Sequence, residues 1–100
     1  IVFHDDLDVD FGKIKAKFGG SSAGHNGIES IDKFIGKDYS RVRIGIGKPN
    51  GKSNAADHVL KDFDEDEKLE LGNITMHITN SIPILLDKKL DLFSSTVNNQ

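Results

Sequence analysis

Apolar and polar residues alternate along two short stretches of the chain, residues 13–18 and 41–47. Side chains at every second position of a β-strand share one face, so each stretch predicts a strand with an apolar face and a basic face. The residues expected to face a core are Ile14, Ala16 and Phe18 in the first stretch and Val42, Ile44 and Ile46 in the second. The apolar residues 1–3 predict the end of a further, buried strand.

A spacing of three and four between apolar residues predicts a short helix over residues 27–35. Asn26 is the expected N-cap, and Glu29, three positions later, would complete a capping box. Gly36 stands where a helix commonly ends.

A longer helix is expected to begin after Asp64, with Glu67 at the third helical position as its capping-box partner. The apolar face of this helix consists of Leu71, Ile74, Ile78, Ile82 and Leu85. Residues 55–60 predict a short helix or turn that carries His58 at the surface. The polar residues 94–100 predict a frayed end.

The length of 100 residues allows one domain at most. The chain contains no cysteine, which excludes disulfides and thiolate metal sites. No apolar run approaches the roughly 20 residues of a membrane span, and no signal peptide is visible in residues 1–100, so we expect a cytoplasmic protein without a membrane contact. Because the sequence opens within an apparent strand and without a methionine, we expect it to be part of a longer protein.

The net charge of −3 conceals an uneven distribution. Residues 11–56 hold nine Lys and Arg against three Asp and Glu, whereas the segments before and after are acidic. A basic middle segment indicates a local anionic partner, and scattered solvated charge is the alternative. Since no aromatic residue lies between the basic ones, contacts to phosphates are favoured over stacking on unpaired bases.

Four carboxylates, Asp5, Asp6, Asp8 and Asp10, follow the first predicted strand. The carboxyl ends of strands are where α/β sheets collect their chemistry. Three interpretations remain open for this acidic segment. It is a solvated turn, a metal site built from carboxylates, or the source of one carboxylate that orients a histidine elsewhere.

Four segments together, in their order, spacing and residue types, resemble bacterial peptidyl-tRNA hydrolase. They are His4-Asp5-Asp6-Leu7-Asp8, Lys15-Ala16-Lys17-Phe18-Gly19-Gly20-Ser21, Gly24-His25-Asn26-Gly27-Ile28 and Arg41-Val42-Arg43-Ile44-Gly45-Ile46-Gly47. The resemblance covers essentially the whole chain, but the family's proteins are about twice as long. Residues 1–100 therefore correspond to the C-terminal portion of a single family domain.

The resemblance implies an α/β fold with a mixed sheet and helices on both faces, here as a partial domain. It also implies hydrolysis, without metal or cofactor, of the ester that links a peptide to the 3′ ribose of tRNA. The family's catalytic histidine lies in the N-terminal half, and no histidine of this sequence matches it. We therefore expect the fragment alone to be inactive.

The same resemblance assigns candidate roles to single residues. Asp5 matches the carboxylate that orients the catalytic histidine, and Asn26 matches the asparagine that hydrogen-bonds the water or the reacting carbonyl. Lys17 and Arg43 match positions that hold tRNA phosphate. The tRNA-binding set that we expect is Lys15, Lys17, Asn26 and Arg43.

If the family function applies, Asp5 and Asn26 should lie close together at one cleft, with Lys17 and Arg43 at its rim. Peptidyl-tRNA is then the partner, and we expect a monomer. A non-catalytic RNA-binding domain is the main alternative, because it needs the basic strand but no proximity between Asp5 and Asn26. A metal-dependent hydrolase that uses the carboxylates is a third possibility.

Overall fold

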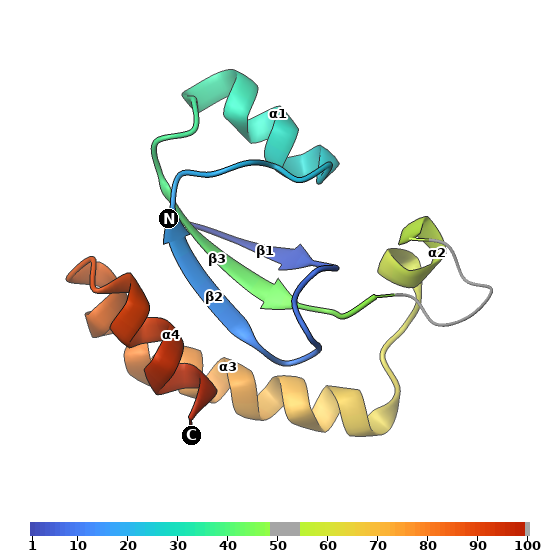
Figure 1. The fold of residues 1–100 in the computed structure, drawn as a ribbon. Helices are drawn as coiled ribbons and strands as arrows, with labels where there is room; N and C mark the ends of the chain where they lie inside the picture. The colour runs from blue at the N-terminus through green and yellow to red at the C-terminus, as the bar shows by residue number, and fades with distance from the viewer. Residues whose placement is uncertain (49–54, 100) are drawn as a thin grey trace.

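The computed structural model describes residues 1–48 and 55–99. Three strands form one sheet in the order β1-β3-β2 (Figure 1), namely β1 (Val2–Asp6), β2 (Ile14–Phe18) and β3 (Ser40–Gly45). β1 runs parallel to β3, and β2 runs antiparallel to it, so the sheet is mixed. Both strands predicted from alternation are present, and they are neighbours.

β1 extends further than the three apolar residues had predicted. It continues to Asp6, so Asp5 and Asp6 are strand residues that pair with Ile44 and Gly45 of β3. Among residues 1–100, Phe3 is 42% exposed, so the elements of this chain alone do not bury β1. The reason lies in the position of β1, which is an outer strand of this sheet.

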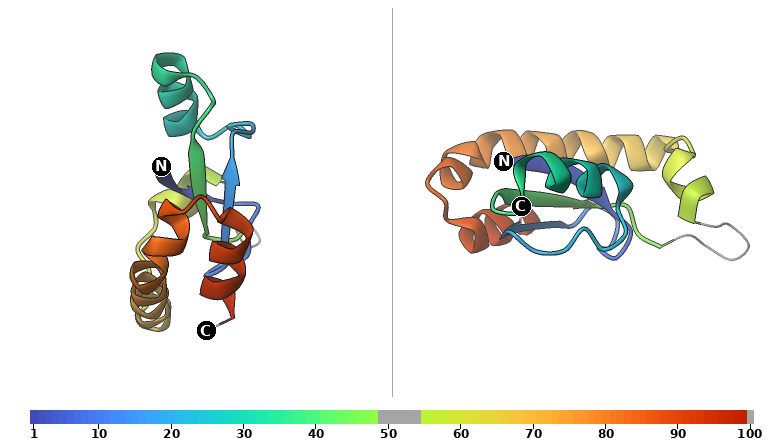
Figure 2. Two further views of the ribbon diagram at one scale, coloured as in Figure 1. Left: turned by 90° about the vertical axis from the view of Figure 1, so that its left-hand side faces the viewer. Right: turned by 90° about the horizontal axis from the view of Figure 1, so that it is seen from above.

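Helices cover both faces of the sheet (Figure 1, Figure 2). α1 (Asn26–Ile35) lies on one face, and α3 (Glu65–Leu86) and α4 (Leu90–Asn98) lie on the other. The short α2 (Ala55–Leu60) lies beyond the end of the strands. The predicted fold class, an α/β partial domain with a mixed sheet and helices on both faces, is confirmed.

The core lies between the sheet and the pair α3–α4. Its buried members are Ile14 and Ala16 from β2, Val42 from β3, Ile74 and Leu85 from α3, and Phe93 and Val97 from α4. The alternation pattern therefore assigned the inner faces of β2 and β3 correctly within the strands, except at the end of β2. There Phe18 is 58% exposed, because it stands at the last strand position and beyond the reach of the core. Ile46, expected on the same face as Val42 and Ile44, lies beyond the end of β3 and outside the core.

α3 begins as its sequence predicts. The Asp64 side chain accepts a hydrogen bond from the Glu67 amide, and the Glu67 side chain accepts one from the Asp64 amide. This capping box satisfies two backbone N–H groups that the first helical turn leaves free. The expected apolar face is also confirmed, since all five of its residues lie in or against the core.

The C-terminal segment is helical, and the expectation that residues 94–100 are frayed is wrong for residues 94–98. Ser94 and Asn98, four residues apart on α4, face the outer side of β2. The Ser94 hydroxyl accepts from the Ala16 amide at 2.8 Å. Asn98 accepts from the Ile14 amide and donates to the Ile14 carbonyl, both at 2.8 Å. These polar side chains serve backbone groups that have no strand beside them, which is why a polar segment is ordered here.

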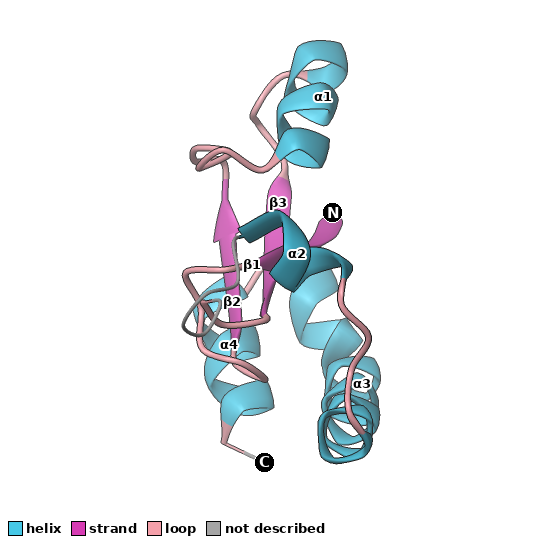
Figure 3. Ribbon diagram, turned by 90° about the vertical axis from the view of Figure 1, so that its right-hand side faces the viewer, coloured by secondary structure: helices cyan, strands magenta, loops and turns pink. Residues whose placement is uncertain are grey.

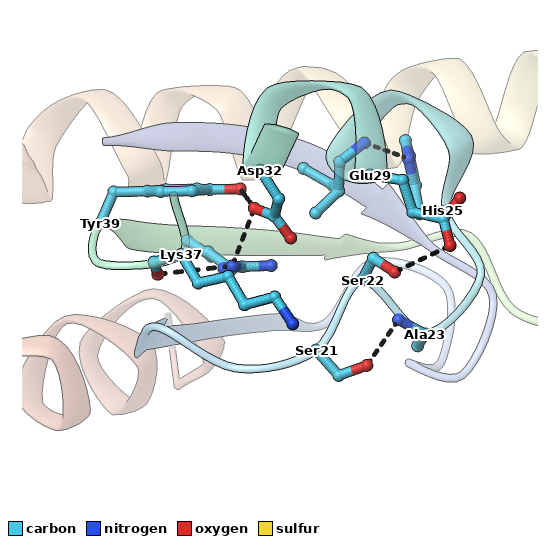
Figure 4. A network of polar contacts seen from close by, with 10 residues as sticks. Ser21, Ser22, Ala23, His25, Glu29, Asp32, Lys37 and Tyr39 are labelled. Atoms are coloured by element: carbon cyan, nitrogen blue, oxygen red, sulfur yellow. Dashed lines mark hydrogen bonds and ion pairs between the residues drawn. The ribbon is translucent and has the colours of Figure 1, made fainter. Parts of the chain in front are cut away.

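Arg41 lies on the predicted basic face of β3 together with Arg43, but its side chain is fully buried. Its guanidinium lies 3.1 Å from Asp32 of α1 and 4.5 Å from the centre of the Tyr39 ring. The Tyr39 hydroxyl donates to the same Asp32 oxygen at 2.7 Å (Figure 4). Burial, and then the bond to Asp32, raise the pKa of Tyr39 above 10.0, although the positive charge of Arg41 opposes this. This cluster connects α1 to β3.

A tight turn connects β1 to β2 and presses against β3. Gly12 has a φ of 82°, and the Lys13 amide donates to the Asp10 carbonyl, so residues 10–13 form a turn. A Cβ atom on Gly45 would clash with the Asp10 carbonyl oxygen and lie 2.7 Å from that of Val9. Glycine at position 45 therefore permits the β1–β2 turn to pack on β3.

In the described part of the chain, no helix has an apolar stretch long enough to cross a lipid bilayer.

Candidate functional site

A cavity of about 570 Å³ lies where β1 ends and α1 begins. Figure 3 views the molecule from this end of the strands, with α2 in front. The lining consists of residues 4–8 from the end of β1 and the loop after it, residues 22–27 before and at the start of α1, and Val59 of α2. Asp5 and Asn26 are both among these residues, so the structure brings the two candidate catalytic side chains to one cavity.

The carboxylate of Asp5 is held by a histidine to which the resemblance had assigned no role. His25 Nε2 lies 2.7 Å from Asp5 Oδ1, and the side chains are 29% and 39% exposed. Since a carboxylate oxygen accepts, the imidazole donates this bond. Within the described residues, the second carboxylate oxygen of Asp5 has no hydrogen-bond partner. Asp5 can therefore orient another donor while it remains bound to His25.

The predicted N-cap of α1 is wrong by one residue. His25 is the N-cap, with φ −71° and ψ 112°, and its Nδ1 accepts from the Ile28 amide at 3.2 Å. Asn26 is the first helical residue, and its side chain makes no hydrogen bond within the described part of the chain. Glu29 accepts instead from the Ser22 hydroxyl at 3.4 Å (Figure 4). Because histidine performs the capping, the Asn26 amide remains available to a ligand in the cavity.

His4 packs beside His25 at the inner side of the cavity. The two rings are 5.2 Å apart between centroids and meet edge to face at 75°. His4 Nδ1 donates to the carbonyl oxygen of Asp5 at 2.8 Å, while its Nε2 is buried without a hydrogen-bond partner in the described residues. Asp5 is thus bonded to one histidine through its backbone and to another through its side chain.

The basic residues expected to bind tRNA lie on the strands and do not line this cavity. Lys15 and Lys17 are exposed on β2, and Arg43 lies opposite Lys15 in the strand register, so the three belong to one face of the sheet. Arg43 Nε is 3.8 Å from Asp6 Oδ2, so part of its charge is already balanced. The two lysines are therefore the more available cations for a phosphate.

Among the other acidic residues near β1, the Asp6 carboxylate has two partners within the described protein. Asp6 faces Arg43 and also accepts from the Asp8 amide at 2.8 Å, which relieves part of the repulsion between these acids. In residues 1–48 and 55–99, no three His, Asp or Glu side chains are grouped as a metal site requires. The hypothesis of a metal-dependent hydrolase thus has no supporting ligand cluster in this part of the chain.

His58 was expected at the surface, but it is half-buried and its Nε2 donates to the Ile46 carbonyl at 2.9 Å. This bond attaches α2 to the end of β3. His58 and Asp5 also line a second cavity of about 250 Å³. Asp5 consequently lies between two cavities, with α2 forming part of the wall of each.

A sequence profile of the family described as "Peptidyl-tRNA hydrolase" matches residues 1–100. The chain is 77% identical over 100 residues to a peptidyl-tRNA hydrolase of Pelagibacter ubique, covering 54% of that relative. It is 52% identical over 91 residues to one of Aliarcobacter butzleri, covering 91% of this chain and 50% of the relative. The chain thus spans about half the length of these curated relatives.

Solved structures also match this chain, again over about half of their own length. The crystal structure of peptidyl-tRNA hydrolase from Acinetobacter baumannii gives a TM-score of 0.81 at 32% identity, covering 96% of this chain and 49% of that one. A variant of that enzyme gives a TM-score of 0.82 over the same shares of the two chains.

Proposed function

Because this chain belongs to the peptidyl-tRNA hydrolase family, we propose that the full-length protein hydrolyses the ester between peptide and tRNA in peptidyl-tRNA. The reaction returns tRNA to translation in the cytoplasm, and the enzyme acts as a monomer without metal or cofactor. The observation that carries this proposal is that Asp5 and Asn26, which are 21 positions apart, line the same cavity at the end of β1.

Ester hydrolysis requires an activated water, a base to take its proton and a donor for the developing oxyanion. Asp5 supplies the carboxylate that orients the base, through the oxygen that His25 does not occupy. The base is the family's histidine, which the resemblance places outside residues 1–100. Asn26, whose amide has no internal partner in the described chain, donates to the water or the reacting carbonyl.

The nucleic acid is held by cations on the sheet. Lys15 and Lys17 are exposed at alternate positions of β2, with Arg43 beside Lys15 on the same face. Lysines on one face can contact successive phosphates, and such contacts recognise the shape and charge of an RNA stem more than its sequence. Asn26 adds a contact at the reacting end of the substrate.

Replacing Asn26 with aspartate in the full-length protein tests this assignment. We expect the rate of ester hydrolysis to fall about 10²-fold, because the variant loses the donor that stabilises the oxyanion. Binding of tRNA, measured by fluorescence anisotropy, should persist because the lysines are intact. Asn73→Asp makes the same change at an exposed position of α3 and should leave both values unaltered. If the Asn26→Asp variant hydrolyses the ester at an unchanged rate, the proposed role of Asn26 is refuted. If the unmodified protein binds tRNA but does not hydrolyse the ester, the non-catalytic RNA-binding alternative is correct.

The 100-residue chain on its own is expected to show no turnover of peptidyl-tRNA, since it lacks the histidine that serves as the base. The measurement is release of free tRNA from N-blocked aminoacyl-tRNA, compared with the uncatalysed background. Turnover by this chain that Asp5→Asn abolishes would show that the base lies within residues 1–100.

A further inference from the structure

We propose that His25 is a positioning residue of the ester-hydrolysing site, which holds the Asp5 carboxylate and the first turn of α1 in one fixed arrangement. This inference rests on the proposed function, and it adds a role for a residue that acts through Asp5 and Asn26. His25 is suited to this task because it joins β1 to α1 through two hydrogen bonds, one at each ring nitrogen.

The partners of the two ring nitrogens determine the tautomer of His25. A backbone amide can only donate, so Nδ1, which faces the Ile28 amide, carries a lone pair and no proton. A carboxylate oxygen can only accept, so Nε2 carries the proton that is shared with Asp5. In this neutral form both nitrogens are occupied, and no lone pair remains to take a proton from water. His25 therefore cannot act as the general base while it makes these contacts.

The position of the His25 ring depends on a glycine in the first turn of α1. A Cβ atom on Gly27 would lie 3.1 Å from Cε1 and 3.3 Å from Nδ1 of the ring. Both distances are shorter than normal van der Waals contact, so a Cβ at this position would push the imidazole by a few tenths of an ångström from its place over the helix terminus. The edge-to-face contact with His4 supports the ring from the side of β1. Gly27 and His4 together confine the ring to the orientation that reaches Asp5.

The consequence for the site is a fixed direction of the Asp5 carboxylate. Its side chain is 39% exposed, so without His25 water would compete for Oδ1 and the carboxylate could rotate. With Oδ1 bound, the direction of Oδ2 is fixed as well. Asn26 follows His25 directly in the chain, so the same residue sets the distance between the carboxylate and the amide.

Two substitutions in the full-length protein separate positioning from stability. In His25→Asn, the asparagine can still cap α1 but is too short to reach Asp5, so stability should be retained. We expect kcat to fall about 10-fold while KM changes less than about 2-fold, since a displacement of 1 Å can cost about 10²-fold in rate. In Gly27→Ala, the ring must shift although alanine is the better helix former, so kcat should fall about 3-fold with equal or higher thermal stability.

Gly72→Ala is the matched control, because it makes the same change in α3 at a position with no heavy atom within 4 Å of the added Cβ. It should leave kcat unchanged. A second readout is the nitrogen NMR spectrum of His25, which should show an unprotonated Nδ1 and a protonated Nε2.

Wild-type kcat in His25→Asn, or a protonated Nδ1 in the neutral ring, would overturn the inference. These results differ from a failure of the proposed function, in which the unmodified protein would not cleave peptidyl-tRNA at all. In that event the NMR spectrum still decides whether His25 links Asp5 to the helix.

Discussion

Replacing Asp5 with asparagine in the full-length protein is expected to lower kcat for peptidyl-tRNA hydrolysis by about 10³- to 10⁴-fold, as when the orienting carboxylate of a histidine base is neutralised. Asparagine has nearly the same shape, so the cavity should remain intact. It lacks the negative charge that stabilises a protonated base, and its amide group can turn an N–H toward the base and select the wrong tautomer. Steady-state hydrolysis of N-blocked aminoacyl-tRNA measures the effect.

Asp10→Asn provides the matched control for this experiment. Asp10 belongs to the same acidic segment, but its side chain is exposed and does not line the cavity. The same loss of one negative charge at that position should change kcat by less than about 2-fold, since an exposed charge is screened by solvent. Equal losses in the two variants would mean that Asp5 acts only through the overall charge of the segment.

The largest effect on stability is expected at Asp32. Asp32→Ala should lower the free energy of unfolding by about 3–5 kcal/mol, because it leaves the buried guanidinium of Arg41 without its counter-charge. Arg41 is fully buried, and its Nε and one terminal nitrogen already lack partners among the described residues. Urea denaturation followed by circular dichroism measures the change.

A double variant distinguishes the cost of an unpaired charge from the loss of packing. Asp32→Ala combined with Arg41→Met removes both charges and should be more stable than Asp32→Ala alone. Tyr39→Phe removes only one hydrogen bond to Asp32 and should cost about 1 kcal/mol. If the double variant is no more stable than the single one, the contribution of Asp32 does not come from its charge.

The strands and the long helix could be predicted because their signals are local. The alternation in β2 and β3 identifies which side chains share a face, and the capping box at Asp64 marks where α3 begins. The same rules placed Arg41 on the face opposite Val42, which is correct. They could not show that α1 covers this face, because that depends on the contact between Arg41 and Asp32, nine positions apart in the chain. Alternation predicts on which face of the sheet a side chain lies. Whether that side chain is buried depends on the elements that pack against the face.

The cavity contains both candidate catalytic residues, but the contacts within it were not predicted. The resemblance pointed to Asp5 and Asn26, and both line the cavity. The role of His25 was missed because asparagine is the stronger N-cap by preference, so the statistical rule favoured position 26. The signal that could have revealed His25 is steric, since a glycine two residues after a histidine at a helix start leaves room for the ring.

Helix α4 closes one side of the sheet to additional strands. A strand added beside β2 would have to displace Asn98 from both backbone groups of Ile14 and Ser94 from the amide of Ala16. Further strands can therefore join the sheet beside β1, at the edge opposite the one that α4 covers. In relatives about twice as long as this chain, we expect the extra strands to be added next to β1. Because α4 covers the β2 edge, we expect the rest of the domain to pack beside β1, the strand that carries Asp5.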